Sequence, residues 1–175
     1  MHLLPFEKTG GLRVAALRQA GVGAHVWARK EIENYLLVPE AIEAVVAQKT
    51  AKRTSALKRV TRDDVGQRML AIATTHQEEV RGQMLARVLL EKRASGEDMS
   101  TTIVNFNREF DRAWVDPAFV MAVSPGKAIL SELNSWLQSE QGASVTAREI
   151  LNNLPPHLIA DEVEEVMKDI LSAAR

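Results

Sequence analysis

The sequence predicts a mainly α-helical protein that begins with one small strand–helix–strand unit. From residue 39 onward, apolar residues recur at helical spacing and most segments begin with a capping residue. Residues 1–38 instead contain two short apolar runs, HLLPF and AHVWAR, on either side of a helix-like segment. Hydrophobic residues make up 46% of the 175, which is enough for a substantial core.

The composition excludes several classes of protein. The chain has no cysteine, so disulfide scaffolds and thiolate zinc sites are excluded. Its formal net charge of -1 gives no overall attraction to nucleic acid, and any basic surface must be local. We find neither a signal-peptide pattern nor an apolar run near the roughly 20 residues of a membrane span. A soluble cytoplasmic protein without a membrane partner is therefore expected.

The N-terminal unit consists of predicted strands at 2–6 and 24–29 with a helix over 12–21 between them. Gly21 follows the last helical residue and is a plausible C-cap. A stable sheet usually needs three or more strands, so this unit is too small to form one alone. We therefore treat residues 1–38 as one part of a larger α/β arrangement.

The remaining chain is predicted to be helical in two segments, a helical subdomain at 39–122 and a C-terminal part at 123–175. Pro39 occupies a first-turn position, and Thr61 is the N-cap candidate of a stretch that forms one long helix or two. The connector after Trp114 contains a strand-like run at 119–123. The predicted helices cover 39–48, 61–93, 101–114, 127–140, 145–154 and 159–174.

Two carboxylates, Glu31 and Glu33, lie where the second predicted strand gives way to the first helix of the subdomain. In a strand they would project to the same face, at the edge where open α/β sheets bind ligands. Carboxylate oxygens there are the ligands that magnesium or manganese prefers. The favourable interaction of acids with a helix N-terminus explains the same two residues without any ligand.

The surrounding string, WARKEIENYLLVPEAI, resembles a motif of the OLD family (overcoming lysogenization defect) of ATPases, which carry a C-terminal TOPRIM nuclease domain. A second segment, VSPGKAILSELNSWLQ at 123–138, resembles the glycine–lysine segment that follows the helical insertion in that family. The two occur in the family's order. The residues that fit the first motif are Trp27, Arg29, Ile32, Glu33, Asn34, Tyr35, Leu36, Leu37 and Pro39.

The resemblance implies a TOPRIM-like α/β remnant and metal-dependent cleavage of DNA, in phage defence or DNA processing. It implies Mg or Mn held by Glu33, with Glu31 as an outer or alternate ligand. Lys127 would be catalytic, because its charge would stabilise the phosphate in the transition state. Gly126 would allow close backbone approach, and Pro125 would fix the turn.

Simpler structural roles remain open for several of these residues. Lys127 is also explained as a solvated lysine at a helix start, although the helix dipole disfavours a cation there. Trp27 and Tyr35 are explained as core aromatic residues, and Asn34 as a cap or turn residue. His76 lies on an apolar helix face, where a core histidine with satisfied hydrogen bonds is more common than a ligand.

Basic residues form the candidate contacts to DNA. Arg29 and Lys30 precede the carboxylates and could contact phosphate, although a simple surface position explains them equally well. The stretch 48–62 has no acid, and it could hold a nucleic-acid backbone in a salt-dependent way or form a solvated loop. Its basic residues are Lys49, Lys52, Arg53, Lys58, Arg59 and Arg62. The acidic segment DEVEEVMKD is expected to be a solvated face or a mate for that stretch.

The chain departs from the family pattern in two respects. It contains no Asp-x-Asp pair, which supplies further metal ligands in the family, and no P-loop. We therefore expect the isolated chain to bind metal poorly and to be inactive, with an ATPase portion or an upstream TOPRIM segment as partner. Unpaired sheet edges would also favour self-association. The alternative function is a non-catalytic helical module that binds protein or nucleic acid.

Overall fold

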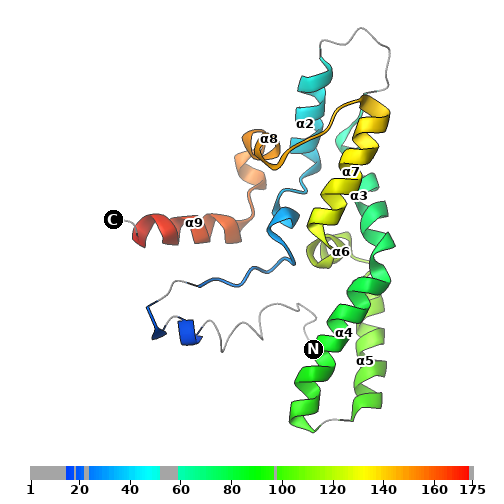
Figure 1. Cartoon of the computed structure of the whole chain (residues 1–175), viewed down its shortest axis with the longest axis vertical. Coiled ribbons are helices and arrows are strands. Elements are labelled where there is room, and N and C mark those ends of the chain that lie inside the picture. Colours follow the sequence, from blue (N-terminus) through cyan, green and yellow to red (C-terminus); the bar gives the residue numbers. More distant parts are fainter. Residues whose placement is uncertain (1–14, 18, 22–23, 52–58, 97, 174–175) are drawn as a thin grey trace.

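The computed structural model describes residues 15–17, 19–21, 24–51, 59–96 and 98–173. Within these ranges the chain is mainly helical and contains no strand, which confirms the mainly α prediction (Figure 1). The elements are η1 (Ile32–Tyr35), α2 (Pro39–Thr50), α3 (Arg62–Thr75), α4 (Gln77–Ser95), α5 (Met99–Ala113), α6 (Pro117–Val123), α7 (Gly126–Gln141), α8 (Ala147–Asn152), η2 (Pro156–Leu158) and α9 (Asp161–Ala173).

The strand predicted at 24–29 is not formed. Residues 24–27 have no regular secondary structure and 28–31 form bends. A strand needs a neighbour with which to exchange backbone hydrogen bonds, and none lies beside this segment in the described part of the chain. The other predicted strand, at 2–6, lies outside the described residues. Gly21 has a φ of 75°, the left-handed conformation expected of a helix C-cap.

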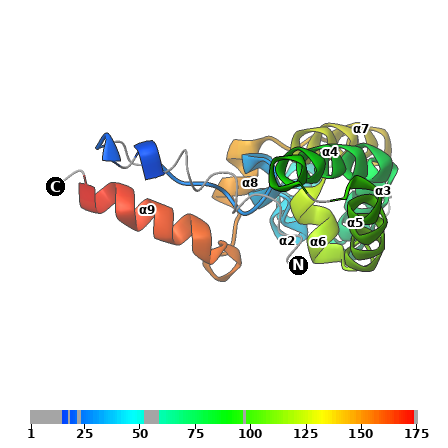
Figure 2. The same ribbon diagram turned by 90° about the horizontal axis from the view of Figure 1, so that it is seen from below.

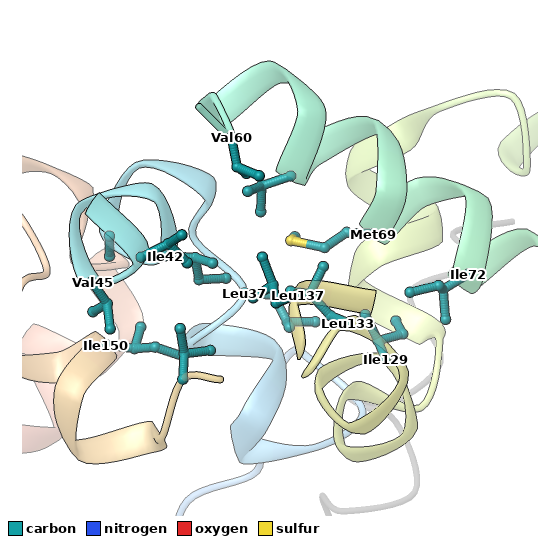
Figure 3. Packing of buried hydrophobic residues seen from close by; sticks show 14 of the residues in the cluster. Leu37, Ile42, Val45, Val60, Met69, Ile72, Ile129, Leu133, Leu137 and Ile150 are labelled. Carbon is teal, nitrogen blue, oxygen red and sulfur yellow. The ribbon is translucent and has the colours of Figure 1, made fainter. Parts of the chain in front are cut away.

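The main hydrophobic core lies between α2, α3 and α7, with contributions from α6 and α8 (Figure 3). Ile42, Leu133 and Ile150 are fully buried in it, although they come from three different helices. This core takes residues from both 39–122 and 123–175, so the two predicted segments pack on each other. Its labelled members in Figure 3 are Leu37, Ile42, Val45, Val60, Met69, Ile72, Ile129, Leu133, Leu137 and Ile150.

A second hydrophobic cluster joins α4 and α5, which extend beyond the main core as a hairpin (Figure 1). Phe106 and Phe110 are fully buried in it. The stretch 61–93 is divided into two helices at His76, which ends α3 and precedes α4. Thr61 is the N-cap of α3 as predicted, because its side chain accepts a hydrogen bond from the amide of Asp64.

The strand-like run predicted at 119–123 is wrong, since these residues lie in helix α6. Asp116 caps this helix by accepting a hydrogen bond from the amide of Ala118 at 2.9 Å, and Pro117 occupies its first turn. A short apolar run does not distinguish a strand from a buried helix. The capping residues before it indicate a helix more clearly.

Helix α9 extends away from the helices that form the two cores (Figure 2). It follows η2 and points toward the same side as the segment that leads into η1 (Figures 1 and 2). Across the described ranges, no helix combines the length and apolar character needed to cross a membrane.

Candidate functional site

The two motif segments are in contact. The carboxylate of Glu31, just before η1, accepts a hydrogen bond from the backbone amide of Lys127 at 2.8 Å, although 96 residues separate them. Helix α7 begins after Pro125, which offers no side-chain acceptor for the free amides of the first turn. Glu31 therefore caps α7 from another part of the chain, at the end of the helix where a negative charge is favourable.

Asn34 fastens η1 to the corner between α6 and α7. Its side chain is 1% exposed and donates hydrogen bonds to the carbonyl of Met121 at 2.7 Å and of Ser124 at 3.0 Å. Its Oδ1 accepts a third bond from the amide of Glu31 at 2.9 Å. A buried amide with this many partners holds its neighbours in one arrangement, because breaking any bond leaves a buried polar group unsatisfied. Asn34 is thus the cap-like residue that the sequence allowed, and it also joins distant segments.

Gly126 makes this contact possible. A Cβ at this position would lie 2.6 Å from Oδ1 of Asn34 and 2.8 Å from its backbone nitrogen. Both distances are shorter than any carbon tolerates, so a glycine is needed for η1 and the start of α7 to approach this closely. The close-approach role expected of Gly126 is present, and the group it approaches is the side chain and backbone of Asn34.

Glu33 and Lys127 lie on these two joined elements, and neither charged group is paired with a residue that the structure describes. Glu33 is half-buried, and its carboxylate forms no hydrogen bond or ion pair with any residue that the structure describes. Lys127 is exposed, and its ammonium group likewise has no partner among the described residues. The packing of η1 on the start of α7 brings the two residues into the same region of the molecule.

The carboxylates do not by themselves make a metal site. Among the residues that the structure describes, no three or more His, Cys, Asp or Glu side chains come close enough to hold a metal ion. One oxygen of Glu31 is used by the amide of Lys127, so Glu33 is the carboxylate left free at this corner. This donor set is too small to displace most of the hydration shell of Mg²⁺ or Mn²⁺.

Tyr35 and Glu162 form a second cluster beside the motif, between η1 and α9. Glu162 accepts hydrogen bonds from the hydroxyl of Tyr35, from Nε2 of His25 at 2.7 Å and from the amide of Ala28 at 2.8 Å. Tyr35 is buried, as expected of a core aromatic residue, and Trp27 packs between its ring and that of His25.

The pKa values in this cluster are shifted. Burial, followed by the hydrogen bond to Glu162, raises the pKa of Tyr35 to about 12. Burial also raises the pKa of Glu162, but the hydrogen bonds from Tyr35, His25 and Ala28 outweigh that effect and hold it below its usual range. Sequence reasoning missed Glu162, because a glutamate in an acidic amphipathic helix gives no sign of a partner more than 100 residues earlier.

The predicted DNA-contacting residues Arg29, Lys30 and Arg59 lie in the described part of the chain, and all three are engaged within the protein. The guanidinium of Arg29 donates to the carbonyl of Asn34 at 2.6 Å and lies 4.6 Å from the centre of the Tyr35 ring. The ammonium of Lys30 donates to Gln83 at 2.9 Å. Arg59 pairs with Glu43 at 3.2 Å.

The basic stretch 48–62 is only partly described, since Lys52, Arg53 and Lys58 lie outside the described residues. Lys49 pairs with Glu149 at 2.8 Å, and Arg62 lies 3.8 Å from Glu40. These partners come from α2 and α8, whereas the acidic segment of α9 supplies none of them. The described basic residues of the stretch are therefore paired with neighbouring acids, although Arg59 and Arg62 stay exposed to solvent.

His76 is not a fully buried core residue, because it lies at the junction of α3 and α4 with its side chain 19% exposed. Its ring nitrogens face Glu79 at 3.4 Å and Glu132 at 3.3 Å. Its hydrogen-bonding capacity is satisfied by these two acids, in agreement with the structural role expected for it.

Comparison with protein-family models, with curated protein sequences and with solved structures gave no match.

Proposed function

We propose that this chain forms part of a TOPRIM-type, metal-dependent DNA endonuclease resembling the OLD-family proteins, and that Glu33 and Lys127 belong to its active site. The observation that carries the proposal is the contact between the two motif segments, made by Glu31, Asn34 and Gly126. Segments with a shared catalytic function have to meet in space, and these two do so through residues of the motifs themselves.

The residues where η1 meets the start of α7 would have different roles in this activity. Glu33 would offer its free carboxylate as one ligand of a divalent metal, which would activate water and polarise the phosphate when bound. Lys127 would place a positive charge near that phosphate. Glu31 and Asn34 would hold the two elements in register. The strand-like segment 24–29 would pair only when further strands of a TOPRIM sheet are supplied.

The described residues do not complete the metal site, so we expect the chain alone to bind metal weakly and not to cleave DNA. The test is titration of the ¹⁵N-labelled chain with Mn²⁺, a paramagnetic ion that broadens the NMR signals of nearby amides. Weak binding should broaden the amides of residues 31–35 and 126–128 first. Glu33→Gln should remove this effect, and Glu40→Gln, which changes an acid elsewhere on the surface, should leave it unchanged.

Broadening centred on another region, or equal broadening in Glu33→Gln, would contradict the assignment of Glu33. A plasmid-nicking assay with Mg²⁺ or Mn²⁺ should show no cleavage by the isolated chain. Cleavage that depends on Lys127 would show that the chain carries ligands beyond those described.

A non-catalytic helical module that binds protein is the second candidate, and one observation favours it. Helix α9 carries apolar side chains that remain exposed, which is typical of a surface with a partner. Lys49, Arg59 and Arg62 each lie beside an acid, which does not favour nucleic acid as that partner.

A further inference from the structure

Helix α9 presents an apolar stripe to solvent. The stripe consists of Val163, Val166, Met167, Ile170 and Leu171, at the spacing that places side chains on one face of a helix. The two valines are half-buried, whereas Met167, Ile170 and Leu171 are 51%, 56% and 61% exposed. Several large apolar side chains exposed together on one helix face are typical of an interaction surface.

The helix is held in a fixed orientation at its first turn. Glu162 accepts hydrogen bonds from His25, Ala28 and Tyr35, which ties the start of α9 to the segment leading into η1. The rest of α9 extends away from the two hydrophobic cores (Figure 2). The first turn of α9 is therefore held by hydrogen bonds, and the described chain leaves the outer half of the apolar stripe uncovered.

Acidic residues border the stripe. At about 100° per residue, Glu164 lies next to Leu171 on one side of the stripe and Asp169 next to Val166 on the other. Lys168 is the one basic residue between 161 and 173, against five acids, and it is paired with Glu164 at 3.4 Å. Asp169 has no ion pair within the described part of the chain. The surface is thus apolar in the middle, with acids outnumbering the one lysine around it.

This charge pattern distinguishes between occupants. Helices that lie on membranes carry lysine and arginine on their polar face, because cellular membranes are negatively charged, and α9 has the opposite charge. A second copy bound through the same face would bring together two surfaces that each carry more acids than bases. A protein segment with apolar side chains flanked by lysine or arginine satisfies both features.

We propose that α9 is a docking site for a partner protein that presents an apolar helix face bordered by basic residues. This interface is independent of the nuclease assignment, because it uses neither Glu33 nor Lys127. The partner's apolar side chains would cover Met167, Ile170 and Leu171, and its cations would face Glu164 and Asp169.

The test uses the full chain and two synthetic helical peptides that share one leucine stripe, flanked by lysines in the first and by glutamates in the second. Fluorescence anisotropy should show binding of the lysine peptide that weakens with added salt, and no binding of the glutamate peptide. The double variant Met167→Ser/Ile170→Ser should bind the lysine peptide at least about tenfold more weakly. Leu90→Ser, which removes a 72% exposed leucine from α4, should not change binding.

A charge reversal provides a second test that does not depend on the apolar substitutions. Glu164→Lys/Asp169→Lys should reverse the preference, so that the glutamate peptide binds and the lysine peptide does not. The proposal is overturned if neither peptide binds, or if the preference is unchanged by the reversal. It is also overturned if sedimentation shows a dimer that Met167→Ser/Ile170→Ser abolishes, or if the chain binds anionic lipid vesicles through this face.

Discussion

The backbone nitrogen of Asn34 lies so close to Gly126 that a Cβ on the glycine would be 2.8 Å from it. This nitrogen belongs to the backbone, so a rotation of the Asn34 side chain alone could not relieve the clash. Together with the hydrogen bond from Lys127 to Glu31, this close approach defines the corner where the two motif segments meet.

Gly126→Ala should destabilise the protein by about 1–3 kcal/mol, because the added methyl group forces η1 away from the start of α7. Gly82→Ala is the matched control, since a Cβ there meets nothing within 4 Å and the residue lies inside α4. That control should stabilise the protein by about 0.5–1 kcal/mol. Urea unfolding measures both, and equal effects of the two substitutions would contradict the close approach.

Asn34→Ala should cost about 3 kcal/mol or more, because it leaves the carbonyls of Met121 and Ser124 and the amide of Glu31 without their partner. Asn105→Ala removes an exposed asparagine from α5 and should change stability by less than about 0.5 kcal/mol. Urea unfolding midpoints compare them. A small effect at Asn34 would mean that the three hydrogen bonds do not hold the corner together.

Tyr35 should titrate with a pKa of about 12 in the folded protein. It is the chain's one tyrosine, so the ultraviolet absorbance of tyrosinate reports on it directly. The Tyr35 hydroxyl holds its proton more tightly in the folded state than in the unfolded state. Its contribution to the free energy of unfolding is therefore complete below pH of about 10 and is lost as the pH rises toward 12. Tyr35→Phe should lack this part of the pH dependence, and a titration midpoint near 10 in the folded chain would exclude the buried hydrogen bond.

Glu162 should contribute stability on the acid side. Its pKa is depressed in the folded protein, so the contribution is present above its ordinary value of 4.5 and disappears as the pH falls through the lower folded value. Glu162→Gln should remove this dependence and loosen the start of α9. Hydrogen exchange should then quicken in 161–166 and at the amide of Ala28, whereas Glu165→Gln, on the exposed side of α9, should leave both unchanged.

Ser124→Ala should leave stability unchanged or raise it by up to about 1 kcal/mol. The Ser124 hydroxyl is buried without a hydrogen-bond partner within the described part of the chain, so its removal takes away an unsatisfied polar group. The carbonyl that Asn34 uses belongs to the backbone and is retained. Thermal unfolding measures the change, and a clear loss of stability would reveal a partner for the hydroxyl.

The helices were predictable because their signals are local. Thr61 and Pro39 mark helix starts by short-range chemistry, and apolar spacing identifies the buried face. The strand predicted at 24–29 is not formed, because strand pairing depends on a neighbour that local sequence does not specify. The run at 119–123 was misassigned because β-branched and aromatic residues suit both a strand and a buried helix.

The sequence indicated which two segments belong together, but not the contacts through which they meet. The segments containing Glu33 and Lys127 were selected from the sequence, and the structure brings these segments together. The partner of Glu31 is a backbone amide, which leaves no trace in the sequence. The attachment of Tyr35 to Glu162 spans 127 positions and depends on how α9 packs, so no local pattern could indicate it.

Asn34 recognises the α6–α7 corner through two carbonyl oxygens, those of Met121 and Ser124. Every amino acid has such a carbonyl, so these two hydrogen bonds place no requirement on the side chains at 121 and 124. Asn34 has no such freedom, since aspartate lacks the donor and glutamine is longer. The joint therefore requires one particular side chain, at position 34, and recognises its two partners by their backbone alone.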